Sequence, residues 1–247
     1  MKRKMTEGAP EDGVIVHESG FLRAEIEGEQ GHALVLLNSP LPTVSLALWR
    51  RAAVVVCADG GANWVYDDLP ALAVASGDYD GEAAAREALL PRYLIGDLDS
   101  VRPEVRAFYA ARGTVVIDLS ADQDSTDFMK ALDLIQGELR PNGGALVPIS
   151  APIVALCGSG AERPDHDLGN MSTLFERAHR RIALVGRHCV TRCLPAGRNA
   201  LRLTEAEGPQ CGLIPMAGPA RATTKVGHSM VGSRRVFAAV HGECVNA

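Results

Sequence analysis

The sequence predicts an α/β protein in which a parallel, doubly wound sheet is followed by a smaller, truncated antiparallel β-sandwich domain. Strand-like aliphatic runs alternate with helical segments from about residue 33 to 178, as in βαβ units. Beyond residue 181, short alternating segments broken by Pro-Ala-Gly indicate antiparallel strands. We therefore expect a loosely ordered leader over 1–30, an α/β domain over 31–180 and a β-rich domain over 181–247 with a divergent tail at 225–247.

The first half of the predicted sheet comes from two aliphatic runs. Residues 32–40 end in Asn-Ser-Pro, which predicts a buried strand and a turn. Residues 53–61 are β-branched and end in two glycines, which predicts a second strand. Helical spacing predicts a helix over 44–52, and another helix is expected to begin at 62. Glycines in the alanine-rich stretch that follows predict a surface loop before a helix at 82–90.

The second half continues the alternation. Strands are predicted at 92–96 and 114–119, separated by a helix at 102–113 that has Pro near its start and Gly at its end. An amphipathic helix is predicted over 125–139, because Phe128, Leu132 and Ile135 share one face. The remaining elements are a strand within 143–158 and a helix within 169–180.

Composition and charge limit the classes of function. The chain has 247 residues, of which 47% are hydrophobic and 4% aromatic, so aliphatic side chains must fill a sizeable core. The formal net charge of −5 argues against nucleic-acid partners, which usually meet a basic face. No apolar run reaches the roughly 18 residues of a membrane span, and no segment resembles a secretory signal. We therefore expect a cytoplasmic protein without a membrane partner.

Six cysteines are scattered along the chain without a Cys-x-x-Cys pair. His188, Cys189 and Cys193 are close in sequence and suggest zinc, but a second pair of ligands is missing. Reduced thiols of a cytosolic protein are the favoured interpretation.

Polar clusters follow four predicted strands, at the edge where parallel sheets bind ligands. Asp97 and Asp99 lie at positions i and i+2, so in an extended chain both side chains point the same way. Asp127, in the helix after the neighbouring strand, should meet them. Three carboxylates in one place need a cation, and oxygen ligands with room for phosphate favour Mg²⁺. The sequence therefore predicts a site where Mg²⁺ holds the phosphates of a nucleotide.

The pair Gly60-Gly61 ends the second strand, and the lack of side chains lets backbone N–H groups approach an anion closely. The same pair is common in plain tight turns. Structural roles stay open for several polar residues. They are turn formation for Asp59, Asp97 and Asp99, and helix capping for Asp124, Ser125 and Asp127. Gln123 is alternatively a surface residue, Arg163 a solvated or ion-paired arginine, and His166 an ordinary histidine at a helix start.

Three segments together carry a resemblance to a known family: CADGGANWVYD at 57–67, LIGDLDSVRPEV at 94–105 and DQDSTDFMKALDLI at 122–135. In this order and at these spacings they resemble thiamine pyrophosphokinase, especially its eukaryotic form. Residues 170–180 and 211–224 also look like that family. The similarity runs from about residue 33 to 224, with an unusual insertion at 70–90.

The resemblance implies a homodimer that transfers a pyrophosphoryl group from ATP to the hydroxyl of thiamine and leaves AMP. It also implies an N-terminal α/β domain and a C-terminal β-sandwich in each chain. An aspartate of the acidic cluster, Asp99 or Asp127, would orient or accept the hydroxyl proton. The implied site residues are Asp97, Asp99 and Asp127 for catalysis and magnesium, Asp59, Gly60, Gly61, Arg163 and Asp165 for the nucleotide, and Gln123 and Asp124 for thiamine.

The chain departs from the family pattern at three places. Trp64 stands where the family usually has a basic residue, and Pro164 stands where it usually has Phe. The tail at 225–247 lacks the Trp-bearing strand and the Ser-Thr-Ser-Asn stretch that hold thiamine at the family's dimer interface. A non-catalytic or impaired nucleotide- or thiamine-binding variant is therefore an alternative. A metal-dependent phosphohydrolase is a weaker one, because an acidic cluster with Mg²⁺ also suits water as the nucleophile.

Overall fold

The chain is divided into two compact units. The computed structural model describes residues 14–23, 31–139, 144–148, 150–157, 163–207 and 212–215, and the backbone of two strands at 222–230 and 233–241. One unit contains residues 24–193, and the other contains residues 1–23 and 194–247. The larger unit therefore extends beyond the boundary predicted at 180, and the smaller unit includes part of the predicted leader.

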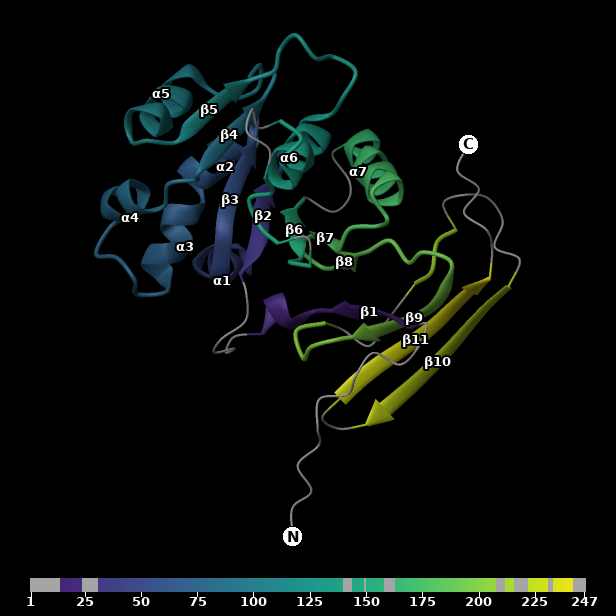
Figure 1. Ribbon diagram of the computed structural model, residues 1–247. Coiled ribbons are helices and arrows are strands. Elements are labelled where there is room, and N and C mark those ends of the chain that lie inside the picture. Colours follow the sequence, from purple (N-terminus) through teal and green to yellow (C-terminus); the bar gives the residue numbers. More distant parts are fainter. Residues whose placement is uncertain are drawn as a thin grey trace. The chain divides into compact units, whose positions relative to one another are not determined.

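The larger unit is built on a seven-stranded sheet, and its first six strands in sheet order run parallel. The prediction of a parallel, doubly wound α/β fold is thus confirmed (Figure 1). The strands in sheet order are β5 (Val115–Asp118), β4 (Tyr93–Gly96), β3 (Ala52–Ala58), β2 (His32–Leu36), β6 (Ile153–Leu156), β7 (Ile182–Val185) and β8 (Val190–Thr191).

The chain order of these strands reverses at β2. Strands β3, β4 and β5 are added on one side of β2, whereas β6 and β7 are added on the other side. The reversal lies between β2 and β6, which remain paired as far as the hydrogen bond from the Leu37 N–H to the Leu156 carbonyl oxygen, 3.1 Å. In open α/β sheets, ligands bind at the carboxyl ends of the strands beside such a reversal.

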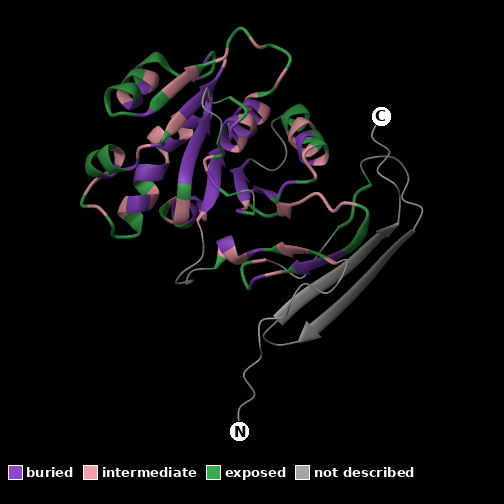
Figure 2. Cartoon of the chain, viewed as in Figure 1, coloured by how far each residue is buried: buried purple, intermediate pink, exposed green. Residues whose placement is uncertain are grey.

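Helices cover both faces of this sheet. Val35, Val56 and Ile95 point to one face and share a buried core with apolar side chains of α6 and α7. Figure 1 shows α6 and α7 on one side of the sheet and α1 to α5 on the other, and Figure 2 shows that the central strands are buried. The helices are α1 (Ser45–Arg51), α2 (Gly61–Asp67), α3 (Leu69–Ala75), α4 (Glu82–Ala88), α5 (Pro103–Ala111), α6 (Asp127–Gln136) and α7 (Pro164–Glu176).

Three predicted boundaries differ from the structure. Helix α3 was not predicted in the alanine-rich stretch; it forms there because Pro70 fits the first helical turn and Leu69 and Ala73 are buried on one face, whereas the loop predicted from Gly77 and Gly81 lies between α3 and α4. Helix α7 begins at Pro164 rather than near 169, again with proline in its first turn. Strand β7 was predicted to belong to the β-rich domain, but it pairs in parallel with β6 and completes the first core.

The smaller unit has one four-stranded sheet in the described part of the chain, in the order β1 (Val14–Glu18), β9 (Gly197–Arg202), β11 (Ser233–His241) and β10 (Ala222–Met230). A short 3₁₀ helix, η1 (Gly20–Leu22), follows β1. The pairing is mixed, because β1 runs parallel to β9 whereas β11 runs antiparallel to β9 and β10. The divergent tail thus supplies strands instead of ending the sheet, and β1 and β10 form its two edges.

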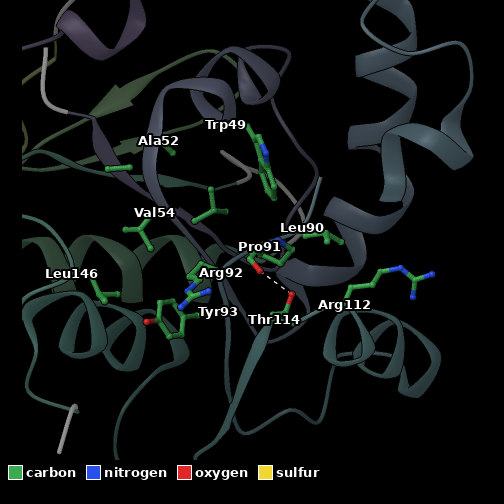
Figure 3. Close-up of a pocket in the computed structure, with 13 residues that line it drawn as sticks. Trp49, Ala52, Val54, Leu90, Pro91, Arg92, Tyr93, Arg112, Thr114 and Leu146 are labelled. Carbon is green, nitrogen blue, oxygen red and sulfur yellow. Dashed lines mark hydrogen bonds between the residues drawn. The ribbon is translucent and has the colours of Figure 1, made fainter. Parts of the chain in front are cut away.

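An open cavity of about 480 Å³ lies at the amino-terminal ends of β3 and β4, with Trp49 and Tyr93 among its lining residues (Figure 3). The hydroxyl of Thr114 donates to the carbonyl of Pro91 across its floor, 2.8 Å. This edge of the sheet is opposite to the carboxyl ends of the strands. Within the described ranges, no helix combines the length and apolar content needed to cross a membrane.

Candidate active site

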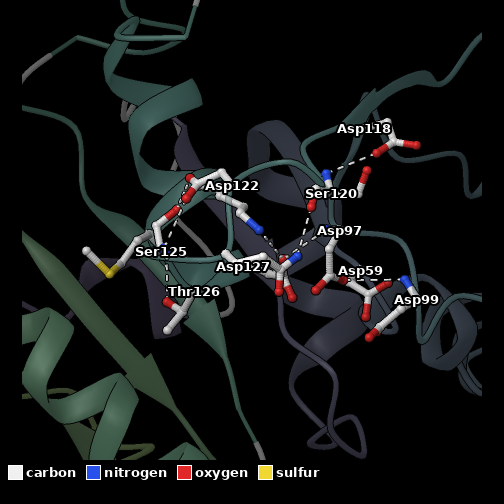
Figure 4. A network of polar contacts seen from close by, with 12 residues as sticks. Asp59, Asp97, Asp99, Asp118, Ser120, Asp122, Ser125, Thr126 and Asp127 are labelled. Carbon is white, nitrogen blue, oxygen red and sulfur yellow. Dashed lines mark hydrogen bonds and ion pairs between the residues drawn. The ribbon is translucent and has the colours of Figure 1, made fainter.

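Three aspartates converge at the carboxyl edge of the larger sheet (Figure 4). Asp59 follows β3, Asp97 follows β4, and Asp127 is the first residue of α6. One carboxylate oxygen of each lies within 4.8 Å of the others. Asp59 is buried, whereas Asp97 and Asp127 are partly exposed. Such an oxygen-only group has the donor chemistry that a hard divalent cation requires.

Asp59 is held in place by its own backbone and by the loop after β4. Its φ of +42° is in the left-handed region, which aspartate tolerates better than most residues. Its Oδ1 accepts hydrogen bonds from the backbone N–H groups of Ser100, 3.2 Å, and Val101, 3.1 Å. These bonds tie the end of β3 to the loop after β4, so the carboxylate is fixed before any ligand binds.

Asp127 is positioned by the start of α6. The helix is capped by Thr126, whose hydroxyl accepts from the Met129 N–H at 3.2 Å. The cap is therefore one residue after Ser125 and two after Asp124, the two positions suggested by the sequence. Asp127 Oδ1 accepts from the backbone N–H of Asp97 at 3.2 Å. Gly96, at φ +153°, permits this approach, because a Cβ there would lie 2.9 Å from that oxygen.

The electrostatics of the group favour a bound cation. Burial raises the pKa of Asp127, and the nearby negative charges of Asp97 and Asp59 raise it further. Lys130 opposes this shift in pKa, with its Nζ 3.4 Å from Asp127 Oδ1 and its side chain only 3% exposed. Among the charges that shift the pKa of Asp127, the ammonium of Lys130 is opposed by two carboxylates, and a divalent cation would relieve the remaining repulsion.

Asp99 is not in this three-residue group. The expectation that it points the same way as Asp97 assumed an extended chain, but Leu98 between them has a φ of +63° and is buried. The Asp99 carboxylate instead accepts from the hydroxyl of Ser100, 2.9 Å, and is exposed. Asp59, for which the sequence suggested a nucleotide contact, occupies the third place. The sequence signal that could have placed Asp59 in this group is its position at the end of the strand next to β4.

The predicted thiamine residues lie in the loop that leads to α6. Asp122 organises this loop by accepting hydrogen bonds from the backbone of Asp124, 3.0 Å, and Ser125, 3.2 Å, and from the Ser125 hydroxyl. These bonds lower the pKa of Asp122, with the Ser125 hydroxyl as the largest cause. Gln123 donates to the Ser120 carbonyl at 2.8 Å. Both Gln123 and Asp124 have exposed side chains at the same edge of the sheet.

Arg163 and Asp165 form an exposed ion pair at the start of α7, with Arg163 Nη2 2.6 Å from Asp165 Oδ2. The guanidinium lowers the pKa of Asp165 to about 2. Both side chains are more than 60% exposed, at 61% and 62%, so they pair with each other and are open to solvent. The loop immediately before Arg163 lies outside the described residues.

The glycines after β3 allow close backbone packing. A Cβ on Gly61 would lie 2.1 Å from the carbonyl oxygen of Leu36, and one on Gly60 would lie 2.4 Å from the side-chain nitrogen of Asn38. The Asn38 Oδ1 also accepts a hydrogen bond from the Trp64 indole N–H at 3.1 Å. The sequence analysis gave no site role to Asn38, which belongs to a predicted turn, or to Lys130, which lies inside the motif at 122–135.

The suggested zinc residues do not assemble. Among the described residues, Asp59, Asp97 and Asp127 form the group of at least three His, Cys, Asp or Glu side chains close enough to hold a metal ion, and His188, Cys189 and Cys193 do not. Cys57, Cys157, Cys189 and Cys193 are free thiols.

Comparisons with known proteins agree with this geometry. Residues 46–185 match the family model described as thiamin pyrophosphokinase, catalytic domain. The chain belongs to the thiamin pyrophosphokinase family. The matched segment covers more than half of the chain and contains all three aspartates of the acidic group.

Curated relatives extend the thiamin pyrophosphokinase match beyond the catalytic segment. Thiamine pyrophosphokinase 1 of Oryza sativa subsp. japonica is 36% identical over 225 residues, which cover 86% of this chain and 82% of the relative. Thiamine pyrophosphokinase 1 of Arabidopsis thaliana is 37% identical over 218 residues, which cover 87% of this chain and 78% of the relative. The structure of the Candida albicans thiamin pyrophosphokinase has the same fold, with a TM-score of 0.67, 18% identity, and coverage of 92% of this chain and 89% of that chain.

Proposed function

We propose that this protein transfers a pyrophosphoryl group from ATP to the hydroxyl of thiamine, giving thiamine diphosphate and AMP. The observation that carries the proposal is the acidic group at the carboxyl edge of the sheet, in a chain of the thiamin pyrophosphokinase family. The thiamine oxygen attacks the β-phosphorus of ATP, and the bond from that phosphorus to the bridging oxygen of AMP breaks. The hydroxyl proton leaves, and AMP carries the released charge.

Asp59, Asp97 and Asp127 would hold Mg²⁺, whose charge would offset that of the phosphates when it is bound. The three carboxylates are already in place, so little reorganisation is needed. Lys130 favours the ionised form of Asp127, because its ammonium group opposes the rise in pKa that burial and the nearby carboxylates cause. Asp99, which the sequence suggested as a metal ligand, is in this proposal a less favoured ligand than these three aspartates.

Asp99 is the better candidate to accept the hydroxyl proton. It lies outside the three-residue group, and a carboxylate bound to a metal ion is a weaker base than an unbound one. Its exposed carboxylate follows Asp97 by two residues, at the same edge of the sheet. In this proposal Gln123 and Asp124 contact thiamine, whereas Gly60, Gly61, Arg163 and Asp165 contact the nucleotide.

The proposal also includes a homodimer, a cytoplasmic location, and thiamine and ATP as partners without nucleic acid or membrane. The rice and Arabidopsis relatives align with 86% and 87% of this chain, so the comparisons give no support to the non-catalytic alternative. Light scattering of the purified protein tests the dimer.

The activity is tested by incubating the purified protein with ATP, Mg²⁺ and thiamine. We expect AMP and thiamine diphosphate to form in equal amounts, and neither to form when Mg²⁺ is chelated. Ligand binding without AMP formation at high enzyme concentration would favour the non-catalytic alternative. Phosphate release from ATP in the absence of thiamine would favour a phosphohydrolase.

A further inference from the structure

We propose that Asn38 binds the nucleotide and that Trp64 is a positioning residue that orients the Asn38 amide. This inference rests on the proposed function, because the nucleotide is the co-substrate of that reaction. It adds Asn38, which lies outside the acidic group, and it gives a role to Trp64, which the sequence marked only as a departure from the family pattern. The hydrogen bond between the two side chains, 3.1 Å from indole nitrogen to amide oxygen, is its starting point.

Asn38 occupies the place in the fold where a ligand is expected. It follows β2 by two residues, directly beyond the last hydrogen bond that joins β2 to β6. The chain order of the strands reverses between these two strands, and ligands of parallel sheets bind beside such a reversal. The Asn38 side chain is exposed at this edge.

Asn38 is also next to the acidic group. Its amide lies against Gly60, since a Cβ on that glycine would lie between 2.4 and 2.8 Å from the amide nitrogen, carbon and oxygen. Gly60 directly follows Asp59, whose carboxylate belongs to the acidic group. A ligand held by that group therefore lies near the Asn38 amide.

The bond to Trp64 decides which end of the amide is available. An indole N–H can only donate, so it must face the amide oxygen of Asn38. The amide nitrogen keeps two N–H donors, and no described residue accepts a hydrogen bond from it. The available chemistry is that of a donor for an oxygen acceptor, which suits the phosphate or ribose oxygens of a nucleotide.

Trp64 is itself only partly buried, in the first turns of α2, so its indole does not need Asn38 for burial. The orientation of the amide depends on this one bond. Removing the indole N–H should therefore weaken ligand binding only by releasing the Asn38 amide. In a protein that already lacks the Asn38 amide, the same removal should not weaken binding further.

The chain offers a direct spectroscopic test, because it has two tryptophans, Trp49 and Trp64. Trp49 lines the cavity at the opposite edge of the sheet. In a Trp49→Phe protein, emission comes from Trp64. We expect α,β-methylene ATP with Mg²⁺, which cannot be cleaved at the reacting bond, to change this emission in a saturable way. Thiamine alone should leave the Trp64 emission unchanged. In the matched Trp64→Phe protein, the nucleotide analogue should leave the Trp49 emission unchanged.

Calorimetry with α,β-methylene ATP and Mg²⁺ completes the test. Asn38→Leu should weaken binding about tenfold, the value of one hydrogen bond to a charged acceptor. Trp64→Phe should weaken it less, and the double variant should bind no more weakly than Asn38→Leu. Wild-type affinity in Asn38→Leu, additive losses in the double variant, or an emission change caused by thiamine alone would overturn the inference.

The two proposals fail in different ways. A wild-type protein that binds the analogue through Asn38 but makes no thiamine diphosphate contradicts the proposed function alone. A wild-type protein that makes thiamine diphosphate while Asn38→Leu binds the analogue normally contradicts the present inference alone. Urea unfolding of each variant checks that the exposed Asn38 and partly buried Trp64 can be replaced without loss of the fold.

Discussion

The carboxylate of Asp127 accepts a hydrogen bond from the backbone N–H of Asp97 across 3.2 Å. This bond joins the first residue of α6 to the loop after β4, and it brings together two negative side chains that repel each other. The fold therefore holds an electrostatically unfavourable arrangement in place through its backbone. Such a cost is characteristic of a site whose charges are balanced by a ligand.

Replacing Asp97 by Asn should abolish turnover and leave the fold intact. The variant keeps the shape of the side chain but removes one carboxylate of the proposed metal site. We expect kcat to fall by at least about 10²-fold. The free energy of unfolding in urea should stay within about 0.5 kcal/mol of wild type or rise, because repulsion of Asp127 is removed. Normal turnover in a folded Asp97→Asn protein would refute the carboxylate–metal account.

Replacing Lys130 by Met should change the pH dependence of activity. Lys130 lowers the pKa of Asp127, so its removal lets the pKa rise further above the usual range. Asp127 must be ionised to act as a ligand. The acid limb of the profile of kcat/KM against pH should therefore move to higher pH. A limb that stays in place, or moves to lower pH, would show that the Asp127 charge does not limit activity.

His32 should make the protein sensitive to mild acid. Burial, assisted by the charge of Arg51, lowers the pKa of His32 to about 4. The unfolded chain takes up a proton below pH 6.5 and the folded chain does not, so stability falls as pH decreases from 6.5 towards 4. Between pH 7.5 and pH 5 this contribution is about 2 kcal/mol.

The matched variant for this prediction is His32→Gln, which cannot titrate. Urea unfolding at both pH values should show a smaller loss of stability in the variant than in the wild type. Equal losses in the two proteins would mean that another group causes the acid sensitivity.

Gly61→Ala should destabilise the protein because the new Cβ would meet the backbone of β2. The contact with the Leu36 carbonyl oxygen is 2.1 Å, and a backbone atom in the central sheet cannot move aside cheaply. We expect a loss of about 1–3 kcal/mol or more. Gly81→Ala is the control, since its Cβ would meet nothing within 4 Å and its φ of −173° suits any residue. Equal stabilities of the two variants would contradict this account of Gly61.

Much of the fold follows from local sequence patterns. The helix that contains Phe128, Leu132 and Ile135 has the predicted face, and all three side chains are buried. The strands of the larger sheet are aliphatic runs, so each can be recognised from its own residues. By contrast, β1 pairs with β9, far along the chain, and local patterns contain no information on such a partner.

The candidate site was predicted only in outline. The rule that parallel strands place their carboxyl ends at one edge correctly brought Asp97 and Asp127 together. The third member differed because the prediction for Asp99 assumed an extended chain, whereas Leu98 has a left-handed backbone, and a leucine gives no sign of that conformation. The Asn38–Trp64 bond depends on two side chains from separate elements, which spacing alone cannot relate.

The central claim is that Asp59, Asp97 and Asp127 hold the divalent cation that binds the phosphates of ATP. Its most direct test is calorimetry of α,β-methylene ATP with Mg²⁺ on Asp59→Asn and Asp99→Asn proteins. We expect Asp59→Asn to weaken binding at least about tenfold, and Asp99→Asn to bind nearly as wild type does while losing turnover. Weakened binding in Asp99→Asn together with normal binding in Asp59→Asn would contradict the claim.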